Sequence, residues 1–172
     1  MTFEIRGRAR RLGERVNTDY IISSSRKKET LDPHVLKRWL LEEVDPDFAT
    51  SVEPNDILVA DEAFGCGSAM EVAVTVVLAA GIEAVVAKSF SRNYFRNAIN
   101  NGLIPVECDT SDIGEGDLIA LRLGEGGVVV LNETTGMRIQ ARPLPPFTLE
   151  ILEAGGLVPY MRIHGGFPEE VL

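Results

Sequence analysis

The 172-residue sequence has few side chains that bind metals: two cysteines, Cys66 and Cys108, and two histidines, His34 and His164. An iron–sulfur cluster or an all-thiolate zinc site needs more thiolates than this chain has, and two histidines are too few for a convincing zinc site. Two cysteines also exclude a disulfide framework and suit a reducing compartment. Any metal would have to come from a partner.

Basic residues are also scarce, with 17 Lys and Arg against 26 Asp and Glu and a net charge of −9. This balance argues against nucleic-acid binding, which needs clustered Lys and Arg. The overall field also repels anions, so a site for an anionic substrate must be built from local positive charge. Three places offer such charge: residues 23–28, residues 87–97 and helix N-termini.

Long hydrophobic runs are absent, since no stretch approaches the length of a membrane span although hydrophobic residues make up 45% of the chain. The first 17 residues contain no apolar signal core, so we expect a cytoplasmic protein. Residues 1–172 are long enough for one domain with a substantial core, and no internal repeat is present.

The middle of the chain alternates short apolar runs with helical patterns that end at glycine. We expect buried strands at 56–61, 82–89 and 103–108, and helices at 68–80 and 91–102. This alternation predicts parallel strands with right-handed crossovers.

The flanking regions have a different pattern. Before the alternation we expect a short strand at 20–23 and a helix that begins at Pro33 after an Asp32 N-cap. After Asp109, three strands separated by glycine-containing turns predict an antiparallel meander, and a short helix follows; these segments are 117–123, 127–132, 137–144 and 147–156. The predicted class is α/β, with a partly parallel central sheet and a small antiparallel meander.

A glycine-rich turn, FGCGSAMEVAVTVV at 64–77, leads directly into an apolar helix. Its glycines can simply allow a tight turn with Ser68 as the N-cap, or the turn can offer backbone N–H groups to an anion. Met70 stands where a dinucleotide fingerprint needs its third glycine, and neither the Walker nor the serine-hydrolase pattern is present.

Three cations follow near the end of the next expected strand. Arg92 and Arg96 are four residues apart and share a helical face, and Lys88 precedes them. Because the carboxyl ends of parallel strands lie side by side, this segment and the glycine turn can face one pocket suited to a small carboxylic acid. The other interpretation is a solvated helix face.

Four segments, in this order and spacing, resemble the small subunit of 3-isopropylmalate dehydratase, the detached swivel domain of the aconitase superfamily. The resemblance covers roughly residues 2–161 and is most specific at RNAINNGL; its segments are NTDYII (17–22), FGCGS…E…A (64–73), KSFSRNYFRNAINNGLIPVE (88–107) and PPFTLEILEAGGLVPYM (145–161). It implies a swivelling β/β/α fold, no cofactor in this chain and a large partner subunit that carries a 4Fe–4S cluster. The implied reaction is the dehydration and rehydration of a 2-hydroxy di- or tricarboxylic acid, as in leucine biosynthesis.

The resemblance also implies roles for residues of the turn. Ser68 matches the serine that removes a proton next to a carboxylate, and Gly67, Ala69 and Met70 line the substrate. The family pattern has a second serine and an arginine, which hold a substrate carboxylate, where this chain has Ala69 and Met70. Losing a charge-assisted hydrogen bond costs roughly 1.5–3 kcal/mol, so another cation is expected.

The loop that follows residues 17–22 supplies candidates for that cation. Relatives commonly continue with Pro-x-x-Tyr-Leu, whereas this chain has three serines followed by Arg26, Lys27 and Lys28. These cations either replace the missing guanidinium or are solvated, and Arg92 and Arg96 are the alternatives. The substrate stays open between 3-isopropylmalate, homoaconitate and dimethylmalate, and a non-catalytic carboxylate-binding relative is a further alternative.

Overall fold

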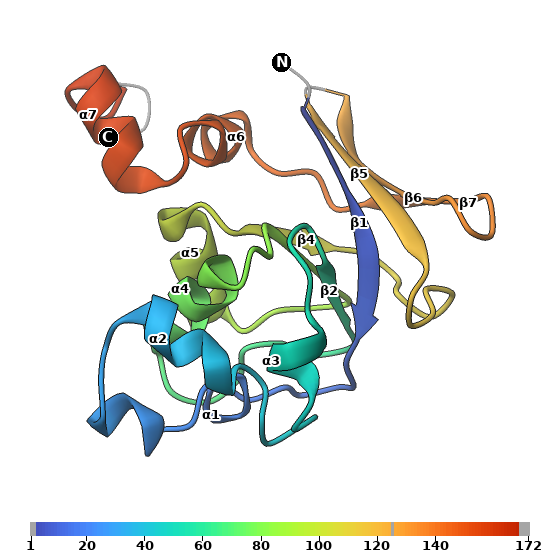
Figure 1. Cartoon of the computed structure of the whole chain (residues 1–172). Coiled ribbons are helices and arrows are strands. Elements are labelled where there is room, and N and C mark those ends of the chain that lie inside the picture. The colour runs from blue at the N-terminus through green and yellow to red at the C-terminus, as the bar shows by residue number, and fades with distance from the viewer. Residues whose placement is uncertain (1–2, 125, 169–172) are drawn as a thin grey trace.

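The computed structural model describes residues 3–124 and 126–168. Its centre is one mixed sheet with the strand order β4-β3-β2-β1-β5-β6-β7 (Figure 1). The strands are β1 (Phe3–Arg11), β2 (Ile57–Ala60), β3 (Ala84–Ala87), β4 (Ile104–Glu107), β5 (Leu118–Gly124), β6 (Gly127–Asn132) and β7 (Met137–Ala141).

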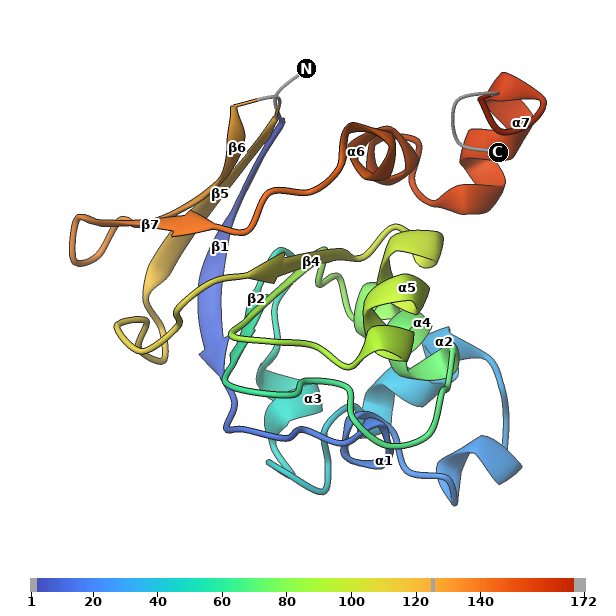
Figure 2. The ribbon, with the colours of Figure 1, turned by 180° about the vertical axis from the view of Figure 1, so that it is seen from behind.

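The helices divide into two groups: α1 to α5 lie around the parallel strands, and α6 and α7 follow the meander and lie beside α5 (Figures 1 and 2). They are α1 (Thr18–Ile21), α2 (Pro33–Leu36), α3 (Phe48–Ser51), α4 (Val72–Ala79), α5 (Arg92–Asn101), α6 (Pro146–Glu153) and α7 (Leu157–His164), with 3-10 turns η1 (Arg26–Lys28) and η2 (Lys37–Trp39). Helix α4 connects β2 to β3 and α5 connects β3 to β4, and both strand pairs are parallel. The predicted β–α–β–α–β unit is therefore confirmed.

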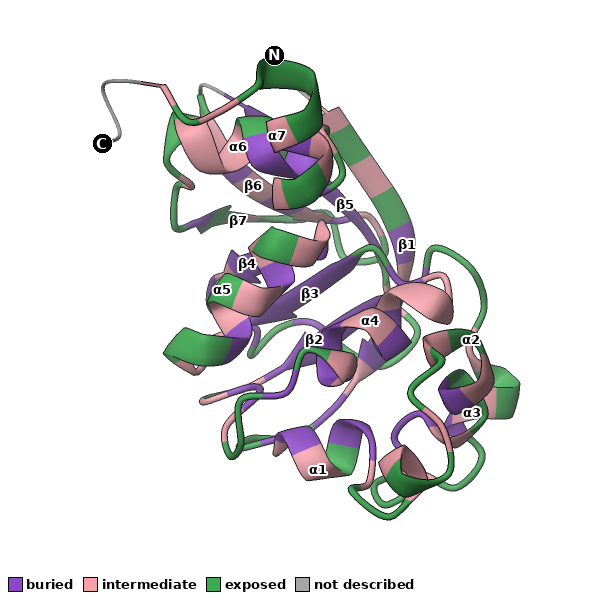
Figure 3. Ribbon diagram, turned by 90° about the vertical axis from the view of Figure 1, so that its left-hand side faces the viewer, coloured by how far each residue is buried: buried purple, intermediate pink, exposed green. Residues whose placement is uncertain are grey.

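Strands β2 and β3 are buried on both faces, as their unbroken apolar runs predict (Figure 3). Leu58 and Val85 join the core that packs against α4 and α5, whereas Ile57 and Val86 join the core beneath β5 and β6. The alternation of side chains along a strand thus divides the parallel strands between two cores. The antiparallel pairs β5–β6 and β6–β7 confirm the predicted meander.

Strand β1, for which the sequence analysis predicts no element, joins the two halves of the sheet. Its first part pairs antiparallel with β5 and its last three residues pair parallel with β2. A Cβ atom on Gly7 would lie 1.7 Å from the carbonyl oxygen of Asn55. Glycine is therefore required where β1 leaves one partner and begins to pair with the other.

The expected strand at 20–23 is wrong, because residues 18–21 form helix α1. The Asn17 side chain accepts a 2.9 Å hydrogen bond from the Asp19 N–H and caps this helix, which outweighs the strand preference of Tyr-Ile-Ile. The helix expected from Pro33 does begin there with its Asp32 cap. It tightens into η2 and ends before Leu41, whose φ is +57°. No described helix is long and apolar enough to cross a membrane.

A buried carboxylate fixes the base of the β1–β2 junction. Asp56 is 3% exposed, and its Oδ2 lies 2.8 Å from Arg8 Nη2 and 3.3 Å from Arg10 Nη1. The Glu53 N–H also donates to it over 3.0 Å. Burial acts to raise the pKa of Asp56, but the hydrogen bonds from Arg8, the Glu53 N–H and Arg10 together outweigh burial and lower it.

Asp56→Asn should lower the free energy of unfolding at pH 7 by roughly 3 kcal/mol, because it removes the buried carboxylate that pairs with both Arg8 and Arg10 and leaves Arg10 only the exposed Glu115 as an acidic partner. The native pKa of Asp56 lies below its unfolded value. Its contribution is therefore complete above about pH 4 and is lost as pH falls through the native pKa. Urea denaturation between pH 7 and pH 3 measures both effects, and the variant should show the smaller acid loss.

Glu4→Gln is the control for this prediction, because it breaks an ion pair between the exposed side chains of Glu4 and Arg122. Its free energy of unfolding should stay near that of the parent. Equal losses in Asp56→Asn and Glu4→Gln would show that the junction does not depend on the buried carboxylate.

Candidate active site on the turn after strand β2

Residues 61–71 connect β2 to α4 and lie at the carboxyl end of the parallel strands. The backbone of Phe64 bonds to the segment after β3: its N–H donates to the Ser89 carbonyl over 3.0 Å, and its carbonyl accepts from the Ser91 N–H over 2.9 Å. The Gly65 N–H donates to the Val16 carbonyl over 2.8 Å. The turn is therefore held from both sides by neighbouring strand ends.

Close contacts explain both glycines of the turn. Gly65 has φ +75°, and a Cβ there would lie 2.2 Å from Cγ of Tyr94. Gly67 has φ +97°, and a Cβ there would lie 2.5 Å from the side-chain oxygen of Asn17. The Tyr94 hydroxyl also donates to the Ala73 carbonyl of α4 over 3.1 Å. Tyr94 therefore connects α5 both to the turn and to helix α4.

Ser68 is exposed, and only its backbone is held: its carbonyl accepts a hydrogen bond from the Thr18 hydroxyl over 2.9 Å. The expectation that Ser68 caps the following helix is wrong. Helix α4 begins at Val72, Glu71 holds the N-cap position, and no side chain makes a capping bond there. Among the described residues, the Ser68 hydroxyl therefore has no structural partner.

The backbone N–H groups of residues 67–72 have no hydrogen-bond acceptor within the described part of the chain. They belong to the segment that contains Ser68 and that leads into the eight-residue helix α4. Uncommitted N–H groups at such a place stabilise negative charge, whether on a bound carboxylate or on an alkoxide. The second interpretation of the turn, an anion site, is thus the one that agrees with the geometry.

The loop of cations reaches the turn at one residue. The Lys27 ammonium contacts the sulfur of Met70, which is 9% exposed. Arg26 faces elsewhere, with its Nε 2.8 Å from Oε1 of Glu42. Lys28 is exposed and makes no contact with the described residues that meets hydrogen-bond or ion-pair criteria. Of the three loop cations, the structure brings Lys27 to Met70, the position at which the resemblance leads us to expect an arginine in the family pattern.

Arg92 and Arg96 both project from α5 and are exposed, as their spacing predicts. They line a cavity of about 430 Å³ together with Phe90 and Phe95, and the remaining lining is Glu107, Arg142, Pro143, Leu144 and Pro145. Residues 65–70 are not part of this lining. The two turns are adjacent, since the rings of Phe64 and Phe90 lie 5.9 Å apart, but the arginines face a neighbouring cavity.

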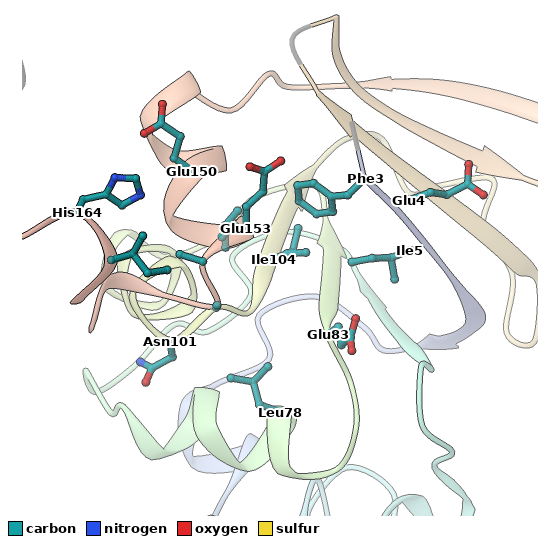
Figure 4. Close-up of a pocket in the computed structure, with 15 residues that line it drawn as sticks. Phe3, Glu4, Ile5, Leu78, Glu83, Asn101, Ile104, Glu150, Glu153 and His164 are labelled. Atoms are coloured by element: carbon teal, nitrogen blue, oxygen red, sulfur yellow. The ribbon is translucent and has the colours of Figure 1, made fainter. Parts of the chain in front are cut away.

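A second cavity, of about 960 Å³, lies at the opposite, amino end of the parallel strands (Figure 4). Its charged lining consists of Glu4, Glu83, Glu150 and Glu153, with no lysine or arginine. An acidic cavity repels a carboxylic acid, and its size alone does not make it the substrate site.

The thiols of this chain do not fit a metal cluster. Cys66 is half-buried in the turn, with its sulfur 3.5 Å from the Arg15 carbonyl. Burial, together with the smaller effect of the Asp109 charge, raises the pKa of the Cys108 thiol to about 12, so Cys108 stays protonated. Among the described residues, no group of three His, Cys, Asp or Glu side chains is arranged to hold a metal ion.

Comparison with known proteins places this turn in a family. The model of the aconitase C-terminal domain matches residues 15–111, which include the turn, α4 and α5. The chain belongs to the aconitase C-terminal domain family.

Relatives of known name match almost the whole chain. The 3-isopropylmalate dehydratase small subunit 2 of Archaeoglobus fulgidus is 40% identical over 92% of this chain and 95% of its own length. The methanogen homoaconitase small subunit of Methanocaldococcus jannaschii is 40% identical over 92% and 91%. The crystal structure of 3-isopropylmalate dehydratase from Methanocaldococcus jannaschii has a TM-score of 0.88 and 37% identity, and covers 95% of this chain and 96% of that one. In fold and family, the chain is an aconitase-type dehydratase small subunit, as the resemblance predicts.

Within this family the sequence analysis identified the turn but missed what supports it. Asn17, Thr18 and Tyr94 hold the turn in place, yet none carries a pattern that points to this role. The available signals were two of the family segments, since 17–22 contains Asn17 and Thr18 and 88–107 contains Tyr94.

Gly65→Ala should destabilise the protein far more than Gly116→Ala. Both positions have positive φ, +75° and +81°, so alanine in this left-handed conformation costs about 1–2 kcal/mol of stability at either position. Only at Gly65 does the new Cβ meet another group, the Tyr94 ring, whereas nothing lies within 4 Å at Gly116. Urea denaturation of the two variants measures the difference, and equal losses would show that the turn does not depend on this contact.

Proposed function

We propose that this chain is the small subunit of a cytoplasmic dehydratase that isomerises a 2-hydroxy di- or tricarboxylic acid, with Ser68 as the proton-removing base. The observation that carries the proposal is the exposed Ser68 hydroxyl, free of structural bonds, on a rigid turn with uncommitted N–H groups. The side chain of an N-cap serine accepts a hydrogen bond from an N–H of the helix, and the Ser68 hydroxyl makes no such bond to α4. The family match supports the same role.

The chemistry of this chain is proton transfer and orientation. Ser68, as alkoxide, takes the proton from the carbon next to a substrate carboxylate. The hydroxyl on the adjacent carbon leaves as hydroxide and becomes water by taking a proton from a donor on the partner subunit or from solvent. The N–H groups of residues 67–72 stabilise the alkoxide before the transfer and select the deprotonated serine. Addition of water in the other direction returns the proton from Ser68 and completes the isomerisation.

The other half of the site belongs to a large partner subunit. The two thiols of this chain cannot hold a cluster, so we place the 4Fe–4S cluster on that subunit. When bound, an iron–sulfur cluster supplies a Lewis acid for the leaving hydroxyl. The relatives are named as small subunits, which supports a heteromeric enzyme.

We favour 3-isopropylmalate as the substrate, and homoaconitate and dimethylmalate are the alternatives. Ala69 and Met70 remove one hydroxyl and one guanidinium from the family's carboxylate site. Lys27 at Met70 supplies a single ammonium in their place, and Arg92 and Arg96 are cations for a second carboxylate. A non-catalytic carboxylate-binding relative is the competing proposal, favoured by the same two substitutions.

The purified chain should have no dehydratase activity alone and should gain it when mixed with the large subunit from the same genome. Formation of the unsaturated acid, followed by its ultraviolet absorbance for each of the three acids, measures this gain. Activity of the small chain without partner and iron would contradict the division of the site between two subunits. A complex inactive on all three acids would favour the non-catalytic relative.

Ser68→Ala should lower kcat of the complex by several orders of magnitude and leave the thermal unfolding of the chain unchanged. The hydroxyl bonds to no described group, so its removal costs no structural bond, whereas a base has no substitute. Ser111→Ala is the control, since that serine is also exposed and its hydroxyl bonds to Asp109 over 2.7 Å. Near-parental kcat in Ser68→Ala would remove the serine from the mechanism.

A further inference from the structure

Arg26 is the most firmly held cation of the 23–30 loop. Its Nε and Nη2 lie 2.8 and 3.1 Å from the two carboxylate oxygens of Glu42, and its Nη1 lies 3.5 Å from Glu29. Its guanidinium carbon also lies 4.7 Å from the centre of the Trp39 ring. A guanidinium held bidentately, paired twice and stacked on a ring is not available to a substrate carboxylate.

The start of the loop is fixed as well. The Ser24 hydroxyl donates to the Asp19 carboxylate on α1 over 2.5 Å, and the Leu41 N–H donates to the Ile21 carbonyl over 2.9 Å. The loop is thus attached at two places. Ser24, before η1, bonds to α1, and Arg26, the first residue of η1, contacts Trp39 and Glu42. Lys27 follows directly after the second attachment.

Lys27 differs from Arg26 in having no acidic partner. Its ammonium contacts Met70 of the turn, and no described carboxylate lies within ion-pair distance of it. A half-buried ammonium beside an apolar thioether has lost part of its hydration without gaining a counter-ion. An anionic group that enters the turn supplies that counter-ion.

We infer that Arg26, Glu42 and Trp39 form a clamp whose function is to place the Lys27 ammonium at Met70, where it binds a substrate carboxylate. This inference deepens the proposed function and rests on it. Arg26 is then a positioning residue that acts through Lys27, and the loop cations have separate roles. The clamp also defines the substrate class. The substrate is an acid whose carboxylate at the turn pairs with a single lysine ammonium and not with a bidentate arginine guanidinium.

Glu42→Gln tests the clamp by the sign of its effect. If Arg26 itself binds substrate, removing Glu42 frees Arg26 and removes a negative charge, so KM falls. If Arg26 positions Lys27, the loop loosens, and KM of the complex should rise about tenfold with kcat retained. Glu43→Gln is the matched control, an exposed neighbour with no ion pair among the described residues. An unchanged or lower KM in Glu42→Gln would overturn the inference.

A double-mutant comparison separates positioning from direct binding. Lys27→Gln and Arg26→Gln should each raise KM, and Arg26→Gln should add nothing in the Lys27→Gln background. Arg26→Lys should also raise KM, because it keeps the charge and loses the bidentate pair. Arg38→Gln is the control, since Arg38 stacks 5.0 Å from the same Trp39 ring without an ion pair among the described residues. Additive effects, or parental KM in Arg26→Lys, would contradict the clamp.

A measurement on the chain alone keeps this inference separable from the proposed function. Acetylation of Lys27 by acetic anhydride, quantified by mass spectrometry against Lys37, reports how firmly the ammonium is held at Met70. Glu42→Gln should speed the modification of Lys27 severalfold and leave the thermal unfolding curve of the chain unchanged. In the control, Glu43→Gln, the modification rate of Lys27 should equal that of the parent. Equal rates would overturn the clamp whether or not the complex is active, and loss of activity in Ser68→Ala tests the proposed function by itself.

Discussion

The candidate site depends on the backbone bonds between Phe64 and the segment that follows β3. The turn after β2 has no regular structure, so the carbonyl of Ser89 and the N–H of Ser91 fix where it lies. The Ser91 hydroxyl strengthens this attachment by donating to the Gly65 carbonyl over 2.6 Å. Because the same serine caps α5, the turn and the helix that carries Arg92 are positioned by one residue.

The attachment also explains why the turn can leave its N–H groups uncommitted. A buried or half-buried backbone group without a partner costs free energy, and the neighbouring strand ends compensate by holding residues 64–66. Residues 67–69 are exposed, so water satisfies their N–H groups until a ligand replaces it. Rigidity on one side and exposure on the other are the conditions for preorganised stabilisation of negative charge.

Local sequence determined much of this arrangement. The apolar runs of β2 and β3 specify strands buried on both faces, and Ser91 and Gly102 delimit α5 as capping rules require. The sequence analysis missed strand β1, although Phe3, Ile5, Gly7 and Ala9 alternate with charged residues as in a strand. Arg6 pairs with Glu133 and Arg8 pairs with Asp56, and both of these partners lie far along the chain.

The error at α1 and the role of Lys27 have a common cause. Tyr-Ile-Ile favours a strand by itself, but the Asn17 cap and the packing of Ile21 in the core favour a helix. That helix sets the direction of the following loop, and the contact between Lys27 and Met70 joins residues 43 positions apart. A contact of this kind depends on Arg26 reaching Glu42, so no pattern within the loop specifies it.

The net negative charge of the chain makes the contact between Lys27 and Met70 important for binding an anionic substrate. With a net charge of −9, the protein repels an anionic substrate at a distance, and screening limits that repulsion to about 8–10 Å at physiological salt. Within that distance of the turn, the balance is set by which cations already have carboxylate partners. Arg26 is neutralised by Glu42, so its charge contributes little at the turn. The Lys27 charge is not offset by any described carboxylate, and the clamp therefore directs this positive charge to the turn.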